Sequence, residues 1–299
     1  MSEKKKLLLI INPKAGKSGY RSGFADVMLT LSNGGYDTTV RFTEGRGDAT
    51  RFAAQHAKEF DTIACIGGDG TLSEVIAGLM TLTDPPDVGY FPMGTTNDIA
   101  TTLGLPKNDT LSAARCLIQG TPHPFDVGGF GKDAYFAYIA AFGAFTEVSY
   151  TTPQDQKKAL GHLAYVLQGM ALLPKLESIP TVVEYDGGRF EGRVLYGSMS
   201  NSSSVAGMIK FTDSMVQLGD GLSELVLVKD PGNMEGVGDI LSAVLTQTYE
   251  ESENLLIVHT KKASFHFEKP VAWTRDGEAG GEFTDVELCN YNAPVRIIF

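Results

Sequence analysis

The sequence predicts a mixed α/β protein of two domains, a three-layer parallel-sheet domain over residues 1–126 and an antiparallel β-sandwich over residues 127–299. Two observations predict this fold class. Apolar, strand-like runs alternate with helical patterns in the first part, which is typical of a parallel sheet with helices on both faces. From about Asp126 onward, short β-rich runs separated by glycine-rich turns replace that alternation, as in an antiparallel sandwich.

Hydrophobic patterning assigns the elements of the first domain in order. Residues 6–12 and 62–66 are nearly unbroken apolar runs, as expected of strands buried on both faces of a sheet. The other expected strands cover residues 38–43 and 87–93. Helices are expected over residues 21–32, 48–59 and 72–80.

The second part of the chain is rich in β-type sequence. Strands are expected over residues 134–141, 181–185, 193–199, 223–228, 255–267 and 285–288. Helical patterns over residues 157–173 and 237–249 interrupt them. The last run, residues 295–299, could pair with either domain.

Composition and charge narrow the possible functions. A formal net charge of −11 disfavours nucleic acid as a partner, and it disfavours stable docking on an anionic membrane through basic residues. The three cysteines lie far apart, with neither metal-binding spacing nor a disulfide pattern. The sequence shows no secretory signal and no run long enough to span a membrane, so we expect a cytoplasmic protein.

Glycine-bearing loops follow three predicted strands, after Ile11, Ile66 and Phe91, where parallel sheets bind their ligands. The first loop, residues 12–19 (NPKAGKSG), resembles the end of a P-loop, but Ile11 stands where that motif requires its first glycine. Pro13 and the two glycines still allow backbone amides to approach an anion. A solvated basic turn is the alternative interpretation.

The second loop (GGDGT) places Asp69 between glycines, directly before a predicted helix. Thr71 followed by Glu74 matches a capping box, which would explain Glu74 by helix capping alone. A helix N-terminus attracts phosphate, whereas Asp69 would repel it unless a divalent cation or a substrate hydroxyl lies between them. A helix cap requires no acid at this position. We therefore expect Asp69 to act on the charge of a bound ligand, through a divalent cation or a substrate hydroxyl.

The third loop (PMGTTND) also ends a strand and opens a helix. Thr95 or Thr96 is the expected cap of that helix, and Asp98 suits its positive end. Together with Asp69 and with Asp126 at the domain boundary, the loop supplies several acids to one end of the sheet. Carboxylates that converge in this way indicate magnesium and its waters.

Several stretches together resemble a known family. NPKAG (residues 12–16), GGDGTLSE (67–74) and GTTNDIA (94–100) are similar, in order and spacing, to the signatures of the diacylglycerol kinase catalytic-domain family. The similarity is greatest to its soluble bacterial lipid kinases, which include sphingosine-kinase-like relatives. FDVG (125–128) and a late DGE (276–278) extend the resemblance over nearly the whole chain. NAD kinases share GGDGT, so GTTNDIA favours the lipid kinases.

The resemblance implies an active site in the cleft between the two domains, with ATP as co-substrate and Mg²⁺ as cofactor. It assigns nucleotide contacts to Asn12, Pro13, Lys14, Ala15, Gly16, Thr43, Gly68, Asp69, Gly70, Thr71, Leu72, Ser73, Glu74 and Thr95. It assigns a magnesium site to Gln217, Asp220 and Leu222, with Asp98 and Asp126 acting through water. Gly219 before Asp220 and Arg275 before the DGE depart from common relatives.

The resemblance also implies the reaction, which is transfer of the γ-phosphate of ATP to the hydroxyl of a lipid alcohol such as diacylglycerol. It makes Asp276 the expected base, with Glu278 as the alternative base and Asp69 as a further catalytic acid. The pair Asp276-Gly277 would also suit a hairpin turn, and the two roles are compatible.

Other functions and partners stay open at this point. An NAD kinase-like or other small-molecule kinase is the second hypothesis, and a non-catalytic nucleotide-binding regulator is the third. We expect transient contact with a membrane surface during turnover, and a homodimer paired through a sheet edge is one option. An apolar stripe between Leu160 and Ala171 is either core or a lid over an acyl chain.

Overall fold

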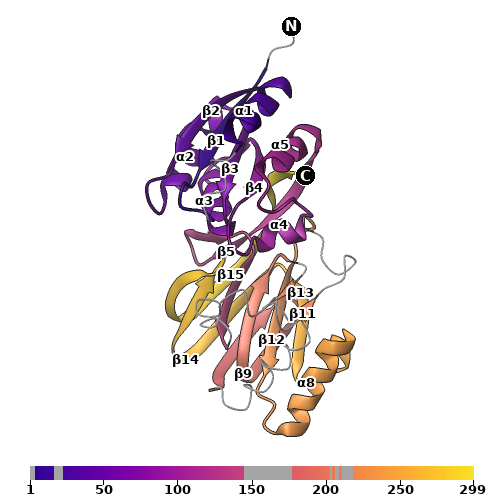
Figure 1. The fold of residues 1–299 in the computed structure, drawn as a ribbon. Helices are drawn as coiled ribbons and strands as arrows, with labels where there is room; N and C mark the ends of the chain where they lie inside the picture. The colour runs from indigo at the N-terminus through magenta and orange to yellow at the C-terminus, as the bar shows by residue number, and fades with distance from the viewer. Residues whose placement is uncertain (1–3, 17–22, 145–176, 203, 206–208, 211–217) are drawn as a thin grey trace. The chain divides into compact units, whose positions relative to one another are not determined.

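The computed structural model describes residues 4–16, 23–144, 177–202, 204–205, 209–210 and 218–299 (Figure 1). These residues fall into two compact units. The first unit takes Met1–Val127, Leu218–Asp220 and Tyr291–Phe299, and the second takes Gly128–Gln217 and Gly221–Asn290. None of the helices in the described part of the chain is both long and apolar enough to span a membrane.

The first unit is built on a parallel sheet. Its strands are β1 (Lys5–Ile11), β2 (Tyr36–Phe42), β3 (Thr62–Gly67) and β4 (Asp87–Pro92). They pair in parallel in the order β4–β3–β1–β2, as the buried apolar runs predict. The end of β15 (Glu278–Ile298) joins the same sheet beside β4, where Ile297 pairs in parallel with Val88. The last run of the sequence therefore belongs to the first unit.

Helices cover both faces of this sheet. They are α1 (Phe24–Asn33), α2 (Asp48–His56), α3 (Asp69–Leu79), α4 (Asp98–Thr102), α5 (Thr110–Gln119) and the 3-10 helix η2 (Ala57–Glu59). Apolar residues of α1 and α5 form one core with Leu7, Leu9 and Ile11 of β1. The alternate residues Leu8 and Ile10 are equally buried, because α2 and α3 lie on the opposite side of the sheet (Figure 1).

Close contacts and caps define these helices. α2 and α3 approach so closely that a Cβ at Gly78 would lie 2.9 Å from the Cβ of Ala53. Helix α5, which the sequence analysis did not predict, begins after Asp109, whose carboxylate accepts the backbone N–H groups of Leu111 and Ser112. The cap was therefore visible in the sequence, as an Asp at the start of a helix-length run.

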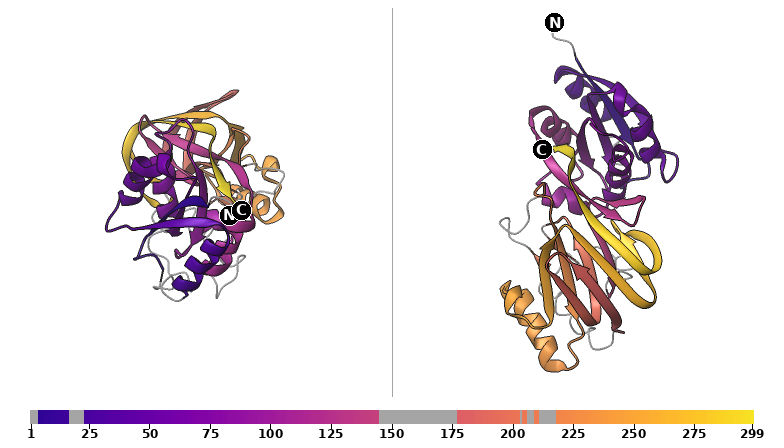
Figure 2. Two further views of the ribbon diagram at one scale, coloured as in Figure 1. Left: turned by 90° about the horizontal axis from the view of Figure 1, so that it is seen from above. Right: turned by 180° about the vertical axis from the view of Figure 1, so that it is seen from behind.

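The described part of the second unit combines antiparallel strands, of which β10 (Ser204–Val205) and β11 (Ile209–Lys210) form a separate pair, with a long helix. β5 (Pro122–Phe130) leads the chain into this unit, and β15 leads it back to the first unit (Figure 2). Its other strands are β6 (Ala134–Phe136), β7 (Ile139–Gly143), β8 (Ile179–Tyr185), β9 (Gly188–Ser200), β12 (Ser223–Lys229), β13 (Leu255–Thr260) and β14 (Lys262–Arg275). The helices among its described residues are α8 (Met234–Thr246) and the 3-10 helix η4 (Tyr249–Glu251).

Strands β7 and β8 occupy the same position in this sheet, between β9 and β14. β7 pairs with the stretch of β9 from Tyr196 to Ser200, and β8 pairs with the stretch from Gly188 to Val194. Both strands also pair antiparallel with β14. Most of the segment between β7 and β8, with the helix predicted over residues 157–173 and its apolar stripe, lies outside the described residues.

The described residues of the second unit include two apolar cores. One contains the aromatic rings of Phe142 and Trp273, whose centroids are 4.7 Å apart. The other joins the strands to α8, where Val237 and Ile240 pack against a cluster that includes Val226. The antiparallel pairing agrees with the sequence prediction, and α8 begins three residues before the predicted range of 237–249.

Candidate functional site

Three loops of the first unit lie in contact at the carboxyl ends of β1, β3 and β4. The side-chain amide of Asn12 donates a hydrogen bond to the Thr71 hydroxyl over 3.2 Å. A Cβ at Gly94 would lie 2.5 Å from the Cα of Gly68, and one at Gly16 would collide with the carbonyl oxygen of the residue before Gly94. Glycine at these positions therefore lets the three loops form one continuous backbone surface.

Asn12 and Lys14 form the hydrogen bonds that fix the first loop. Asn12 Oδ1 accepts the backbone N–H of Lys14 over 3.0 Å. Lys14 Nζ lies 3.4 Å from the carbonyl oxygen of Glu44, in the loop that follows β2. In that loop Thr43 is buried, and its N–H donates to the carbonyl of Ile11 over 2.9 Å. The structure thus brings the loop after β2 next to the first glycine-bearing loop.

The carboxylate of Asp69 caps the helix that follows the third loop. Its Oδ2 accepts the N–H of Asp98 over 2.8 Å, and its Oδ1 accepts the N–H of Ile99 over 3.2 Å. The Tyr90 hydroxyl donates to Oδ1 over 3.3 Å. Burial raises the pKa of Asp69, although these hydrogen bonds oppose the shift. The acid between the glycines therefore joins the second loop to the start of α4.

The third loop is closed by Asn97. This residue adopts a left-handed conformation (φ 53°), and its side chain bonds to both the N–H (2.8 Å) and the carbonyl (2.9 Å) of Gly94. Thr95 and Thr96 are exposed, the N-cap residue of α4 is Asn97, and the first N–H groups of the helix donate to Asp69, so the prediction that a threonine caps α4 is wrong. The sequence analysis also missed Asn97 and Tyr90; a tyrosine inside a buried apolar strand was the available signal.

Glu74 caps a different helix from the one on which it lies. Its carboxylate accepts the N–H groups of Gly47 (2.8 Å) and Ala49 (3.2 Å) at the start of α2. Helix α3 begins directly after its N-cap Gly68, which places Thr71 inside the helix. The predicted capping box of Thr71 and Glu74 is therefore wrong, because the helix starts earlier and Glu74 reaches a neighbouring helix.

The acids proposed to act on magnesium through water lie at different depths. Asp126 is fully buried, and its Oδ1 accepts the N–H of Ala293 over 2.6 Å. Asp98 is partly buried at the first position of α4. Among the described residues, no three His, Cys, Asp or Glu side chains lie close enough together to hold a metal ion. The described residues therefore do not form a site in which several carboxylates would bind the metal ion directly.

The segment proposed to ligate magnesium forms a turn before β12. Asp220 is exposed there, Leu222 is partly buried, and Gln217 lies outside the described residues. A Cβ at Gly219 would lie 2.7 Å from the Cβ of Pro124. The glycine that departs from the family pattern is therefore required by this close approach, and it leaves Asp220 in place.

In the second unit, Asp276 and Gly277 form the two-residue turn between β14 and β15. Both have positive φ (47° and 79°), as in a type I′ hairpin turn, so the predicted turn is confirmed. The Asp276 carboxylate accepts N–H groups from Ala137 (2.8 Å), Tyr138 (2.8 Å) and Ile139 (3.0 Å). Three backbone donors engage this carboxylate, which anchors the segment between β6 and β7.

Arg275 and Glu278 flank this turn, and they are opposite each other in the register of β14 and β15. Glu278 is exposed, whereas Arg275 is partly buried. The guanidinium carbon of Arg275 lies 5.4 Å from the ring centroid of Phe130, which is a cation–π distance.

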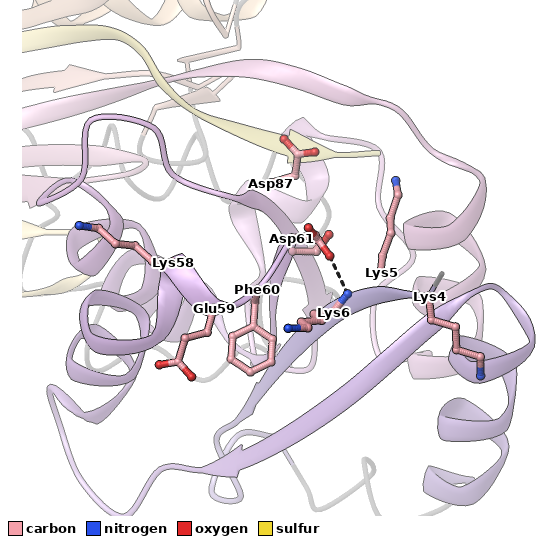
Figure 3. A pocket seen from close by; sticks show the side chains of 9 residues that line it. Lys4, Lys5, Lys6, Lys58, Glu59, Phe60, Asp61 and Asp87 are labelled. Carbon is pink, nitrogen blue, oxygen red and sulfur yellow. Dashed lines mark hydrogen bonds between the residues drawn. The ribbon is translucent and has the colours of Figure 1, made fainter. Parts of the chain in front are cut away.

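A cavity of about 620 Å³ lies at the opposite end of the first unit, where β1 and β4 begin (Figure 3). Its lining includes Lys4, Lys5 and Lys58, but their ammonium groups point in different directions (Figure 3). The Asp61 carboxylate in it accepts the N–H of Lys6 over 2.8 Å. The cavity therefore lies away from the glycine loops and is not the predicted site.

Comparison with known proteins identifies the family. The family model described as diacylglycerol kinase catalytic domain matches residues 6–130. A curated diacylglycerol kinase of Bacillus subtilis (strain 168) is 34% identical over 278 residues, which are 93% of this chain and 91% of that protein. This chain belongs to the diacylglycerol kinase family. Another diacylglycerol kinase, from Staphylococcus aureus (strain MRSA252), is 32% identical over 93% of this chain and 88% of its own length.

Solved structures extend the likeness of this diacylglycerol kinase family member to the fold. A crystal structure of a diacylglycerol kinase from Bacillus anthracis str. Sterne has a TM-score of 0.79 and 24% identity, covering 100% of this chain and 98% of that one. An NAD kinase from Archaeoglobus fulgidus, in complex with ATP, has a TM-score of 0.55 and 12% identity, covering 98% and 93%. The predicted family is confirmed, and as its member the chain is a kinase.

Proposed function

We propose that this kinase transfers the γ-phosphate of ATP to the hydroxyl of a lipid alcohol such as diacylglycerol, in a magnesium-dependent reaction. The contact among the three glycine-bearing loops carries the proposal, because it lies at the carboxyl ends of parallel strands, where such sheets bind nucleotides. The relatives named diacylglycerol kinase support a lipid alcohol as acceptor.

The phosphates of ATP would lie over the start of α3. The N-cap of α3 is Gly68, and among the described residues it offers no side-chain capping hydrogen bond at the positive end of the helix dipole. Gly16 and Gly94 permit the same close approach from the other two loops. Asp69 and Glu74 are compatible with an anion nearby, because each directs its charge to the start of another helix.

Magnesium would neutralise phosphate charge in this site. The carboxylate of Asp220 and the carbonyls of Gln217 and Leu222 would bind it, with Asp98 and Asp126 holding its waters. Oxygen donors of this kind suit a hard cation such as Mg²⁺. The exposed position of Asp220 supports this assignment.

We propose that Glu278 is the base that accepts the proton. This replaces the prediction from the sequence, which made Asp276 the base. The Asp276 carboxylate accepts three backbone N–H groups, and those bonds favour its charged form and would weaken on protonation. Glu278 is exposed on the same hairpin. Its carboxylate takes the hydroxyl proton while the lipid oxygen bonds to the γ-phosphorus and the bond from that phosphorus to the ADP oxygen breaks.

The variants Glu278→Gln and Asp276→Asn separate the two acids. We expect Glu278→Gln to lower kcat by about 10²- to 10⁴-fold with an unchanged melting temperature, as for loss of a general base. Asp276→Asn should lower the melting temperature, because an amide group cannot accept three N–H bonds as a carboxylate does. Loss of turnover in Asp276→Asn without loss of stability, together with an active Glu278→Gln, would return the base to Asp276.

Labelled ATP and a panel of lipid alcohols in mixed micelles test the function itself. The panel contains diacylglycerol, phosphatidylglycerol, a monoacyl lipid and a sphingoid base, each with and without Mg²⁺. We expect labelled lipid phosphate from at least one acceptor, and only with the metal. If none of these lipids gains label, the proposed acceptor class is wrong, and transfer without a divalent cation would contradict the metal requirement.

An NAD kinase-like activity is the second candidate, and the fold likeness to an NAD kinase favours it. It predicts phosphorylation of a soluble alcohol and indifference to micelles. A nucleotide-binding regulator, in contrast, predicts ATP binding with no transfer to any acceptor. A lipid kinase of this kind would meet its acceptor by transient contact with a membrane surface, so its rate should depend on the lipid's surface concentration.

A further inference from the structure

Arg275 carries a charge that the proposed mechanism does not yet use. Its Nε is buried and finds no hydrogen-bond partner among the described residues. Its guanidinium stacks at 5.4 Å on Phe130, whose ring in turn meets Trp273 edge-on at 5.5 Å. Aromatic packing therefore holds the guanidinium in position, and within the described part of the chain no carboxylate forms an ion pair with it.

The hairpin places this cation beside the proposed proton acceptor. Arg275 and Glu278 are directly opposite across the two-residue turn, so their side chains lie on the same face with Cβ atoms about 5 Å apart. Arg275 also packs beside Gly280, where a Cβ would lie 3.4 Å from Arg275 Cγ, an ordinary van der Waals distance. A guanidinium with unused donors beside a proton acceptor is suited to bind an oxyanion.

We infer that Arg275 binds the oxygens of the phosphoryl group while it is being transferred. This inference rests on the proposed function. The hydroxyl oxygen that loses its proton to Glu278 is the atom that bonds to the γ-phosphorus, so the phosphoryl group must come within reach of the same hairpin. Negative charge on its oxygens is then met by a fixed cation that remains protonated, in a chain whose net charge is −11.

The variants Arg275→Met and Arg275→Lys test the inference, with Arg189→Met as the matched control. Arg189 is an exposed arginine of the second unit that pairs with Glu191. On diacylglycerol in mixed micelles, we expect Arg275→Met to lower kcat by about 10²- to 10³-fold, with KM for ATP within about twofold of wild type. Arg189→Met should keep the wild-type kcat, and guanidinium ion in the buffer should restore part of the lost rate to Arg275→Met.

Arg275→Lys should remain strongly impaired, because a lysine keeps the charge but lacks the planar pair of donors. Wild-type kcat in Arg275→Met would overturn the inference. So would a defect confined to KM for an acceptor that carries its own phosphate, such as phosphatidylglycerol, because the arginine would then recognise the lipid. A wild-type protein that phosphorylates no lipid would instead refute the proposed function, and the inference with it.

Discussion

The carboxylates of Asp69 and Glu74 each accept two backbone N–H groups at the first turn of a helix, α4 and α2 respectively. Both acids lie on α3, directly after the glycine loop. Each therefore stabilises a neighbouring helix and positions a neighbouring loop. Backbone amides already engage both negative charges, so these carboxylates are compatible with the phosphate that we propose binds at the glycine loops.

The Asp48 carboxylate likewise accepts backbone N–H groups, in the loop after β2. Its contribution to stability should depend on pH. Hydrogen bonds from Arg51 and from the N–H groups of Glu44 and Gly45 lower its pKa from 3.8 to about 2. A depressed pKa means that this stabilisation is complete above pH 3.8 and is lost as the pH falls toward 2. Urea unfolding should therefore show Asp48→Asn less stable than wild type at pH 6, with the difference shrinking at pH 3.

The control for this experiment is Asp37→Asn, because Asp37 is exposed on β2 and its carboxylate forms neither a hydrogen bond nor an ion pair with another described residue. It should match wild type at both pH values. An Asp48→Asn difference that stays constant between pH 6 and pH 3 would contradict the assignment of these bonds to the charged carboxylate.

At the scale of elements, local patterning predicts the strands and long-range contacts decide the caps. The buried runs of β1 and β3 appear in the sequence as unbroken apolar stretches, and their parallel pairing follows from the alternation with helices. The cap of α4 comes from Asp69, far from it in the chain, so no local motif could reveal it. Local motifs instead suggested Thr95 or Thr96 and the pair Thr71 with Glu74.

For the candidate site, the sequence likewise predicted the local features but not the long-range contacts. Glycine spacing located the three loops, because strand ends of a parallel sheet meet at one edge. The three amide donors on Asp276 come from residues 137–139, which are distant in sequence, and they alter the choice of base. Arg275 was noted only as a departure from the family; its packing on Phe130 required the structure.

The cap that Glu74 provides for α2 can be tested by mutation, because its carboxylate accepts N–H groups at the start of that helix. Glu74→Ala should lower the free energy of unfolding by about 1–2 kcal/mol, as expected for loss of a helix cap. Hydrogen exchange should accelerate at the amides of Gly47 and Ala49, which lose their acceptor. Glu59→Ala is the control; Glu59 forms only an exposed pair with His56, so its loss should change stability little.

The same variant separates capping from nucleotide contact. The capping account predicts that Glu74→Ala changes amide exchange in α2 more than it changes the dissociation constant for ATP. Weakened ATP binding with unchanged exchange at Gly47 and Ala49 would show that Glu74 contacts the nucleotide instead.

At the scale of the whole molecule, each unit carries one part of the proposed reaction. The first unit presents the three glycine loops, and the second presents the DGE hairpin with Glu278 and Arg275. The strands β5 and β15 carry the chain from one unit to the other and back. The domain boundary expected at residue 126 and the cleft expected between the domains remain predictions that biochemical coupling of the two sites can test.

A competition assay tests the central claim most directly. Wild-type protein is given ATP labelled at the γ-phosphate, Mg²⁺, and equal concentrations of NAD and micellar diacylglycerol in one reaction. We expect label to pass to the lipid, with NAD left unlabelled and with transfer slowed by about 10²- to 10⁴-fold in Glu278→Gln. Label in NADP with none in lipid would contradict the claim, and would assign the glycine loops to a kinase of soluble alcohols.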